Sequence, residues 1–214
     1  MNIGVFGSGM VGQTIAGKLV ELGHDVMIGT REPAKLQDWL TTLSGQARVR
    51  SVAEAAAHGE ILFNATNGAA TLEALAVAGE ANMNGKILID LANPLDFSKG
   101  MPPSLTVCNT DSLGEQIQRH YPQVKVVKTL NTVTAALMVD PRQLADGDHH
   151  LFVSGNDADA KVQVTTLLKA GFGWRYIIDL GDITTARATE MYLPLWLRLW
   201  GSQGTGMLNI KVMV

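Results

Sequence analysis

The chain contains little cysteine, little charge and no long apolar run. Its one cysteine among 214 residues is Cys108, so no disulfide can form within the chain, which fits a reducing compartment. Charged residues make up 17% and the net charge is −3; without a basic stripe, this composition argues against nucleic acid as a partner. The uncharged stretch near the C-terminus has only about ten residues, too few to span a bilayer. Because no charged leader precedes the first apolar segment, we expect a cytoplasmic protein.

Spacings typical of metal and catalytic centres are also missing. His149 and His150 are adjacent on a predicted strand and would point to opposite faces, so they do not form a metal-binding pair. Ser8 has no His and Asp partners in a nucleophile-elbow context, which argues against acyl transfer. We therefore predict no metal site and no catalytic side chain, and we expect any chemistry to come from a bound cofactor.

The sequence does contain a regular alternation of β-type and helical segments, in a composition that is 46% hydrophobic. This alternation predicts an α/β fold, a doubly wound parallel sheet of Rossmann type with about eight strands. We expect residues 1–214 to form one domain that ends in a short C-terminal helical or loop segment, residues 183–214. The predicted strands cover residues 2–6, 25–29, 48–52, 61–65, 86–91, 124–128, 150–153 and 176–179, and later helices cover 33–43, 53–57, 72–81, 111–120 and 157–170.

The first predicted strand runs directly into the sequence Gly7-Ser8-Gly9-Met10-Val11-Gly12, and a helical pattern continues to Leu22. Gly7 permits a tight turn, Gly9 lets a ligand approach the backbone, and Gly12 lets the helix lie against the strand. The helix N-terminus then offers unpaired N–H groups and positive potential to phosphates. A glycine-rich turn can also be purely structural, but this order is the one that a dinucleotide pyrophosphate requires. We predict that these six residues bind a dinucleotide.

The end of the second predicted strand determines which dinucleotide is favoured, because ligands bind outside the carboxyl ends of parallel strands. Asp25 opens this strand and lies far from its carboxyl end, where the sequence reads Thr30-Arg31. A guanidinium and a hydroxyl there can bind a ribose 2′-phosphate, and Lys35 follows one helical turn later. The constellation predicts NADP(H), held by these three residues. In the alternative interpretation, Arg31 and Lys35 are solvated surface cations.

Small and polar residues follow three further predicted strands. They are Ala65, Thr66 and Asn67 after the fourth strand, Asn93 and Pro94 after the fifth, and Asn131 and Thr132 after the sixth. We expect the first set near the adenosine or the diphosphate ribose, and the other two as walls of a nicotinamide pocket. Taken singly, each Asn is equally suited to a turn in which it bonds its own backbone.

The C-terminal stretch from Met191 to Trp200 is apolar and aromatic, and the sequence Gly204-Thr205-Gly206 follows it. Three interpretations remain open for this stretch: packing on the sheet, a homodimer interface, and the wall of an acceptor pocket. The glycines can let the backbone approach a flat ring. We predict that Gly204, Thr205 and Gly206 bind the acceptor together with Asn131.

Several parts of the chain resemble a known family. They are residues 2–31, the segment Lys128-Thr129-Leu130-Asn131-Thr132, residues 152–157, and residues 179–181 followed by Ala186-Arg187. These segments resemble the NADPH-dependent 8-hydroxy-5-deazaflavin (coenzyme F420) oxidoreductases, and the cytosolic domains of the six-transmembrane metalloreductases share the pattern. The resemblance implies a soluble homodimer that moves hydride between NADP(H) and a deazaflavin or flavin, with Thr30, Arg31 and Lys35 at the 2′-phosphate. The Asn131 position is commonly His in deazaflavin-reducing members, and Asn cannot donate a charge near the acceptor ring.

Together, residues and resemblance predict an NADP(H)-dependent oxidoreductase whose acceptor is the deazaflavin coenzyme, FMN or FAD. Hydride transfer between two apposed rings needs no obligatory side-chain acid, so the missing catalytic dyad is no objection. One alternative is a reductase of small imines or carbonyl compounds, although such enzymes usually append a long helical domain. The other is a non-catalytic NADP(H) sensor that uses the surface around Trp196 and Trp200 to bind a partner.

Overall fold

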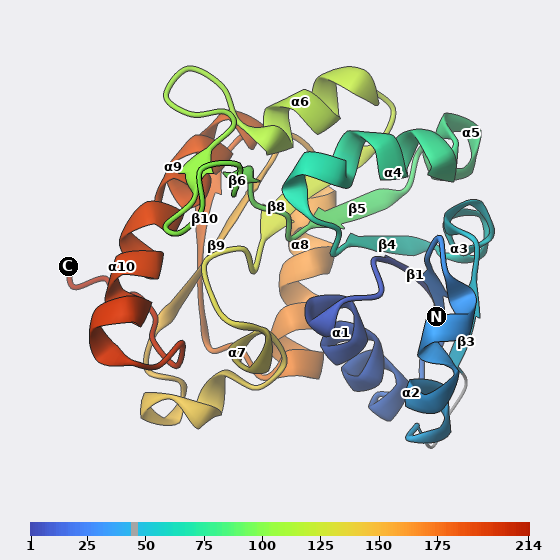
Figure 1. Cartoon of the computed structure of the whole chain (residues 1–214), viewed down its shortest axis with the longest axis horizontal. Helices are drawn as coiled ribbons and strands as arrows, with labels where there is room; N and C mark the ends of the chain where they lie inside the picture. The colour runs from blue at the N-terminus through green and yellow to red at the C-terminus, as the bar shows by residue number, and fades with distance from the viewer. Residues whose placement is uncertain (44–46) are drawn as a thin grey trace.

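The core of the protein is an eight-stranded sheet with the order β10-β9-β8-β5-β4-β1-β2-β3. The computed structural model describes residues 1–43 and 47–214, and Figure 1 shows the sheet running from the C-terminal strands on the left to β3 on the right. The order from β3 through β1 to β8 is that of a doubly wound fold, so the predicted Rossmann-type α/β class is confirmed. The strands are β1 (Asn2–Phe6), β2 (Asp25–Gly29), β3 (Ala47–Arg50), β4 (Ile61–Asn64), β5 (Ile87–Asp90), β8 (Lys125–Thr129), β9 (His150–Gly155) and β10 (Tyr176–Gly181).

The prediction that all eight strands are parallel is wrong for the last two. β8 and β9 pair antiparallel, with Thr129 opposite Val153, whereas β9 and β10 pair parallel to each other. The chain between β8 and β9 contains only the five-residue helix α7 (Ala135–Val139) and two short 3₁₀ turns. A parallel β9 would need a crossover helix to carry the chain back to the amino end of β8, and the helices of this connection are too short for one. β9 therefore starts beside the carboxyl end of β8 and runs in the opposite direction. The ten-residue helix α8 (Ala158–Leu167) then provides the crossover from β9 to β10.

Helices cover both faces of the sheet, and each face has its own apolar core. Ile3 and Val5 of β1 pack in a cluster with residues of α1, α7 and α8, whereas Phe6 packs in a second cluster with residues of α3, α4 and α6. Figure 1 shows these two helical layers below and above the sheet, with α9 and α10 at the left-hand edge near the C-terminus. The remaining helices are α1 (Met10–Glu21), α2 (Gln37–Thr41), α3 (Val52–His58), α4 (Thr71–Ala78), α5 (Glu80–Met83), α6 (Leu113–His120), α9 (Ala186–Met191) and α10 (Leu193–Gln203).

Local capping explains where the elements differ from the predicted boundaries. β3 ends at Arg50 because Ser51 caps α3: its hydroxyl accepts from the Glu54 N–H, and the Glu54 carboxylate accepts from the Ser51 N–H. The predicted helix 72–81 is two helices, since Gly79 between them has a φ of +82°. The predicted helix 33–43 is a 3₁₀ turn, η1 (Pro33–Leu36), followed by the short α2.

One element has no counterpart in the sequence prediction. Residues 92–110, which lie between the predicted strand 86–91 and the predicted helix 111–120, contain a small antiparallel hairpin of β6 (Leu95–Asp96) and β7 (Ser104–Leu105). Strands of two residues are too short for a period-2 pattern to indicate them. In the part of the chain that the structure describes, no helix combines the length and the apolar character needed to cross a membrane.

Candidate functional site

The turn between β1 and α1 requires glycine at two positions. Gly7 has a φ of +113°, and a Cβ there would lie 2.5 Å from the carbonyl oxygen of Ala65. A Cβ at Gly12 would lie 2.0 Å from the Gly7 carbonyl oxygen, so α1 packs directly on the turn. A Cβ at Gly9, in contrast, would meet no other part of the described chain within 4 Å. The space above Gly9 is therefore open to a ligand.

The N-terminus of α1 faces this open space with its backbone groups unpaired by side chains. The helix begins at Met10 after Gly9, which supplies no side-chain cap, and its first turn contains no acidic residue. The first N–H groups of a helix have no intrahelical partner, and the helix dipole adds positive potential there. The turn and the start of α1 can therefore bind a phosphate group.

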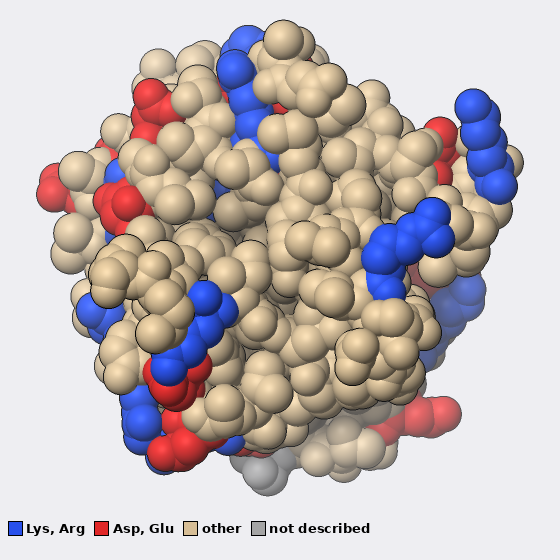
Figure 2. All heavy atoms as spheres, turned by 90° about the vertical axis from the view of Figure 1, so that its left-hand side faces the viewer, with Lys and Arg blue, Asp and Glu red and all other residues tan. Residues whose placement is uncertain are grey.

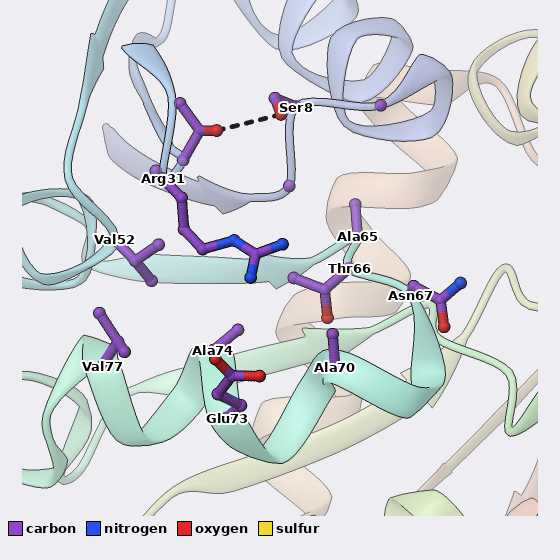
Figure 3. Close-up of a pocket in the computed structure, with 14 residues that line it drawn as sticks. Ser8, Arg31, Val52, Ala65, Thr66, Asn67, Ala70, Glu73, Ala74 and Val77 are labelled. Carbon is purple, nitrogen blue, oxygen red and sulfur yellow. Dashed lines mark hydrogen bonds between the residues drawn. The ribbon is translucent and has the colours of Figure 1, made fainter.

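Thr30 and Arg31 lie beside the glycine turn, at the carboxyl end of β2. The Thr30 hydroxyl donates to Ser8 Oγ at 3.1 Å and accepts from the Glu32 N–H at 3.3 Å, so Thr30 fixes the turn in place. The Arg31 guanidinium extends over the neighbouring cleft (Figure 3), and none of the ion pairs in residues 1–43 and 47–214 includes it. Lys35, in η1, instead pairs with Glu32 at 2.7 Å and is 71% exposed. Arg31 is thus the better placed of the two cations to bind a phosphate.

The cleft beside Arg31 has a volume of about 320 Å³. Figure 3 shows Arg31 extending across it toward α4, with Thr66 and Asn67 at one end and Val52 and Val77 at the other. The cleft is mostly apolar between these groups, which suits a flat heterocycle next to charged phosphates. Its lining residues are Gly7, Ser8, Gly9, Gly29, Thr30, Arg31, Val52, Ala65, Thr66, Asn67, Ala70, Glu73, Ala74 and Val77.

Two further cavities continue this cleft along the carboxyl edge of the sheet. The second, of about 180 Å³, shares Ala65, Thr66 and Asn67 with the first, and the third, of about 210 Å³, shares Val11, Leu91 and Asn93 with the second. Because each cavity shares wall residues with the next, the three lie in a row along the carboxyl edge of the sheet. We call this row the trough; it starts at Arg31 and ends at Asn131. We name its two ends the Arg31 end and the Asn131 end. The other lining residues are Gly68, Ala92, Leu95 and Phe97 in the second cavity, and Met10, Asn131, Thr132, Val133, Thr134, Ala135, Met138, Leu193 and Trp196 in the third.

Two side-chain amides join the ends of β5 and β8 at the Asn131 end. Asn93 Nδ2 donates to the Asn131 carbonyl oxygen at 2.8 Å, and Asn131 Nδ2 donates to Asn93 Oδ1 at 2.9 Å. Close by, two buried polar atoms have no hydrogen-bond partner among the described residues, the hydroxyl of Thr132 and the indole nitrogen of Trp196. An unpaired buried polar group is costly, so both atoms suit a bound molecule that offers them partners.

The structure places the remaining predicted residues at different distances from the trough. Pro94 is buried, and its carbonyl oxygen accepts from the Thr106 N–H at 2.8 Å, so it supports the hairpin. Gly204 and Thr205 are exposed just after α10, whereas a Cβ at Gly206 would lie 3.6 Å from the Trp196 ring. Of the three C-terminal positions, Gly206 thus contacts a wall residue of the trough, and the other two do not line it.

His149 and His150, which are adjacent in sequence, hydrogen-bond the C-terminal tail. His149 Nε2 contacts the Pro141 carbonyl oxygen at 2.9 Å, its Nδ1 contacts Asn209 at 2.7 Å, and His150 Nδ1 accepts from the Val212 N–H at 3.2 Å. Within residues 1–43 and 47–214, the structure contains no group of three or more His, Cys, Asp or Glu side chains that could hold a metal ion.

A buried charged cluster that was not predicted from the sequence lies next to the trough. Lys128 of β8 contacts Asp90 of β5 and Glu190 of α9, and all three side chains are almost completely buried. The sequence did contain a signal for this cluster, because Lys128 and Asp90 lie in strands that are otherwise largely apolar. Charged residues are almost never fully buried unless they are paired. Their partners are far apart in sequence, so the pattern alone could not pair them.

Comparisons with known proteins identify the family. A sequence model described as NADP oxidoreductase, coenzyme F420-dependent, matches residues 2–94. The crystal structure of an Arthrobacter sp. FB24 protein, assigned as an F420-dependent NADP-reductase, has a TM-score of 0.97 and 56% identity, and the match covers 100% of both chains. The chain belongs to the F420-dependent NADP oxidoreductase family.

More distant relatives share parts of this pattern. Metalloreductase STEAP3 of Rattus norvegicus is 28% identical over 200 residues, which cover 91% of this chain but only 37% of that protein. A reductive aminase from Aspergillus terreus, solved in complex with NADPH, has a TM-score of 0.68 at 17% identity, and the match covers 94% of this chain and 62% of the aminase. At that identity, the aminase shows a shared fold alone.

Proposed function

We propose that this protein binds NADPH in the trough and transfers hydride from it to a deazaflavin or flavin. The observation that supports this most strongly is the row of three neighbouring cavities from Arg31, past the glycine turn, to Asn131. A dinucleotide is an extended ligand with a phosphate in its middle, and the α1 N-terminus lies at the middle of this trough. Family membership gives the same cofactor and favours the deazaflavin as acceptor.

The residues present fit NADPH along the whole trough. Arg31 would hold the 2′-phosphate with charge-assisted hydrogen bonds, with Thr30 fixing the turn beside it and Lys35 adding positive charge. The backbone from Gly7 to Gly12 would hold the pyrophosphate, and the open space above Gly9 leaves room for it. Ala65, Thr66 and Asn67 would contact the ribose between the two, and Asn93 with Asn131 would form one wall at the nicotinamide.

The Asn131 end is where we place the reaction. When bound there, reduced nicotinamide supplies the hydride, and a flat acceptor ring apposed to it needs no protein acid to receive it. The Thr132 hydroxyl and the Trp196 indole N–H would orient the rings, because both are buried and lack partners among the described residues. The walls formed by Leu193 and Trp196 would exclude water from the two rings.

We also propose that the C-terminal segment, residues 183–214, completes the acceptor pocket and forms a homodimer interface. Leu193 and Trp196 of α10 line the Asn131 end, and Gly206 packs on the Trp196 ring. On the same helix, Leu195 and Trp200 are exposed. The helix thus has one side for the pocket and apolar side chains left for a second copy of the chain.

Anaerobic stopped-flow absorbance of the NADPH-loaded protein tests the proposed reaction. The protein is mixed in turn with the deazaflavin coenzyme, FMN and FAD, and the absorbance of reduced nicotinamide is followed. We expect rapid oxidation by one of the three, which would also name the acceptor. Tight NADPH binding with no oxidation by any of them would overturn the proposal in favour of a non-catalytic NADP(H)-binding protein.

A further inference from the structure

The buried cluster beside the trough has Lys128 at its centre. The ammonium donates to Asp90 Oδ2 at 2.8 Å, to Glu190 Oε1 at 2.9 Å and to the carbonyl oxygen of Ala92, so each of its three N–H groups has an acceptor. Each of the three charged side chains is at most 1% exposed. Although burial alone lowers the pKa of Lys128, the two carboxylates outweigh it and raise that pKa above its ordinary value. The ammonium is therefore charged at neutral pH.

The cluster holds one wall of the trough through the backbone of Ala92. Asp90 Oδ1 accepts from the Ala92 N–H at 3.2 Å, while Lys128 binds the Ala92 carbonyl oxygen. Ala92 lines the second cavity, and the next residue, Asn93, forms the amide pair with Asn131. Asp90 and Lys128 thus fix the position of the strand-end wall, the part of the trough formed by Ala92, Asn93 and Asn131.

The same cluster also holds, through Glu190, the part of the third cavity that α10 forms with Leu193 and Trp196, here called the C-terminal wall. This carboxylate contacts Lys128 and also accepts from the first N–H groups of α6, those of Leu113 at 2.8 Å and Gly114 at 3.0 Å. Glu190 lies near the end of α9, and α10 starts at Leu193, which lines the third cavity together with Trp196. The pair of Lys128 and Glu190 therefore ties the C-terminal wall to the strand-end wall.

Stability alone gives no reason for this arrangement. Two charges taken out of water carry a desolvation cost, and replacing a buried ion pair by neutral side chains of similar volume is often neutral or stabilising. We propose that Lys128 and Glu190 are positioning residues, which hold the two walls of the Asn131 end at the spacing that the nicotinamide half of NADPH needs. This inference rests on the proposed function, because it assigns the nicotinamide to that end.

The test removes the charges of the whole cluster, so that no unpaired charge stays buried, in the triple variant Asp90→Asn/Lys128→Met/Glu190→Gln. Calorimetry measures its affinity for NADPH and for 2′,5′-ADP, which contains the 2′-phosphate but lacks the nicotinamide half. We expect an affinity for 2′,5′-ADP within about two-fold of that of the unchanged protein, and a loss of about ten-fold for NADPH, equivalent to about 1.4 kcal/mol. Thermal unfolding of the triple variant is followed alongside, to verify that it is folded.

The chain offers a matched control in a neighbouring ion pair. Arg187 of α9 donates from Nε to Glu115 Oε2 of α6 at 2.8 Å. This pair joins α9 to α6, as Glu190 does, but it does not contact the ends of β5 and β8. The variant Arg187→Met/Glu115→Gln should lose stability without changing the ratio of the two affinities. If it changes the ratio as much as the first variant does, looser packing between α6 and α9 explains the loss and the positioning role is wrong.

The remaining outcomes separate this inference from the proposed function. If the triple variant folds and binds both ligands as the unchanged protein does, the positioning role is wrong and the proposed function stands. If it does not fold, the single variant Glu190→Gln, which keeps the ammonium and Asp90, is measured in its place with the same expectation. If the unchanged protein binds neither ligand, the proposed function itself fails.

Discussion

Two glycines of the same turn differ in what a single methyl group would meet. A Cβ at Gly12 would lie 2.0 Å from the Gly7 carbonyl oxygen, whereas one at Gly9 would contact no other part of the described chain within 4 Å. We expect Gly12→Ala to lower the free energy of unfolding by about 1–3 kcal/mol, as overpacking does. Gly9→Ala should leave it within about 0.5 kcal/mol, because Gly9 has a φ that alanine adopts readily.

The same pair separates folding from binding. The methyl group of Gly9→Ala would occupy the space in which we place the pyrophosphate, so NADPH affinity should fall by about ten-fold or more at unchanged stability. Urea denaturation and calorimetry measure the two quantities. A Gly9→Ala protein that binds NADPH as well as the unchanged protein does would show that the pyrophosphate lies elsewhere.

A second prediction at the residue scale concerns Arg31. Replacement by Asp removes its charge-assisted hydrogen bonds and adds repulsion, so NADPH affinity should fall by about a hundred-fold, while NADH, which lacks the 2′-phosphate, should bind almost unchanged. Lys35→Ala serves as the comparison. Because Lys35 pairs with Glu32 and is mostly exposed, this variant should lose several-fold less NADPH affinity than Arg31→Asp does. Calorimetry with both cofactors decides, and an equal loss for NADPH and NADH in the Arg31→Asp protein would assign Arg31 a different role.

At the scale of single elements, α6 is held at its N-terminus by charged groups whose contribution depends on pH. Arg119 hydrogen-bonds the Asp111 carboxylate and lowers the pKa of Asp111 from 3.8 to about 2. A carboxyl whose pKa is lower in the folded state contributes stability that is fully present above its unfolded pKa and is lost as the pH falls toward the folded pKa.

The variant Asp111→Asn should therefore be less stable than the unchanged protein at pH 6, and the difference should narrow as the pH falls to 3. Urea midpoints measured across this range test the prediction. The variant Asp38→Asn, in α2, is the control, because it changes the same kind of group on a helix that packs against the other apolar cluster. A difference that stays constant from pH 6 to pH 3 would show that the ion pair is not its source.

The elements also show how far the sequence could be interpreted. The glycine turn, the start of α1 and the place of Arg31 followed from local patterns, because the turn residues and the helix are neighbours in sequence. The direction of β9 and β10 could not be predicted from local patterns. The alternation of strands and helices does not distinguish a crossover, which makes the next strand parallel, from a connection that stays at one end of the sheet, which makes it antiparallel. The Lys128 cluster did not follow either: its members come from β5, β8 and α9, and only the fold brings them together.

At the scale of the whole molecule, α10 exposes large apolar side chains on one face. Leu195 is 56% exposed and Trp200 43% exposed, and Figure 2 shows a face whose centre consists mostly of uncharged residues. If this face joins two copies of the chain, Leu195→Glu should convert a dimer into a monomer by burying a charge in the interface. Val162→Glu changes an exposed residue of α8 in the same way and should leave the dimer intact.

Sedimentation velocity measures the oligomeric state of all three proteins. A monomer for the unchanged chain, or a dimer that survives Leu195→Glu, would contradict this assignment of the α10 face. The predictions for Gly9 and Arg31 do not depend on this result, because both residues line the first cavity within a single chain.

The central claim is that one molecule of NADPH lies along the trough with its 2′-phosphate at Arg31 and its nicotinamide at Asn131. A crystal structure of the NADP⁺ complex tests this most directly. The account predicts hydrogen bonds from the Arg31 guanidinium to the 2′-phosphate, pyrophosphate oxygens on the backbone between Gly9 and Gly12, and the nicotinamide between Asn131 and Trp196. Nicotinamide in the second cavity beside Phe97, or turned away into solvent, would contradict it.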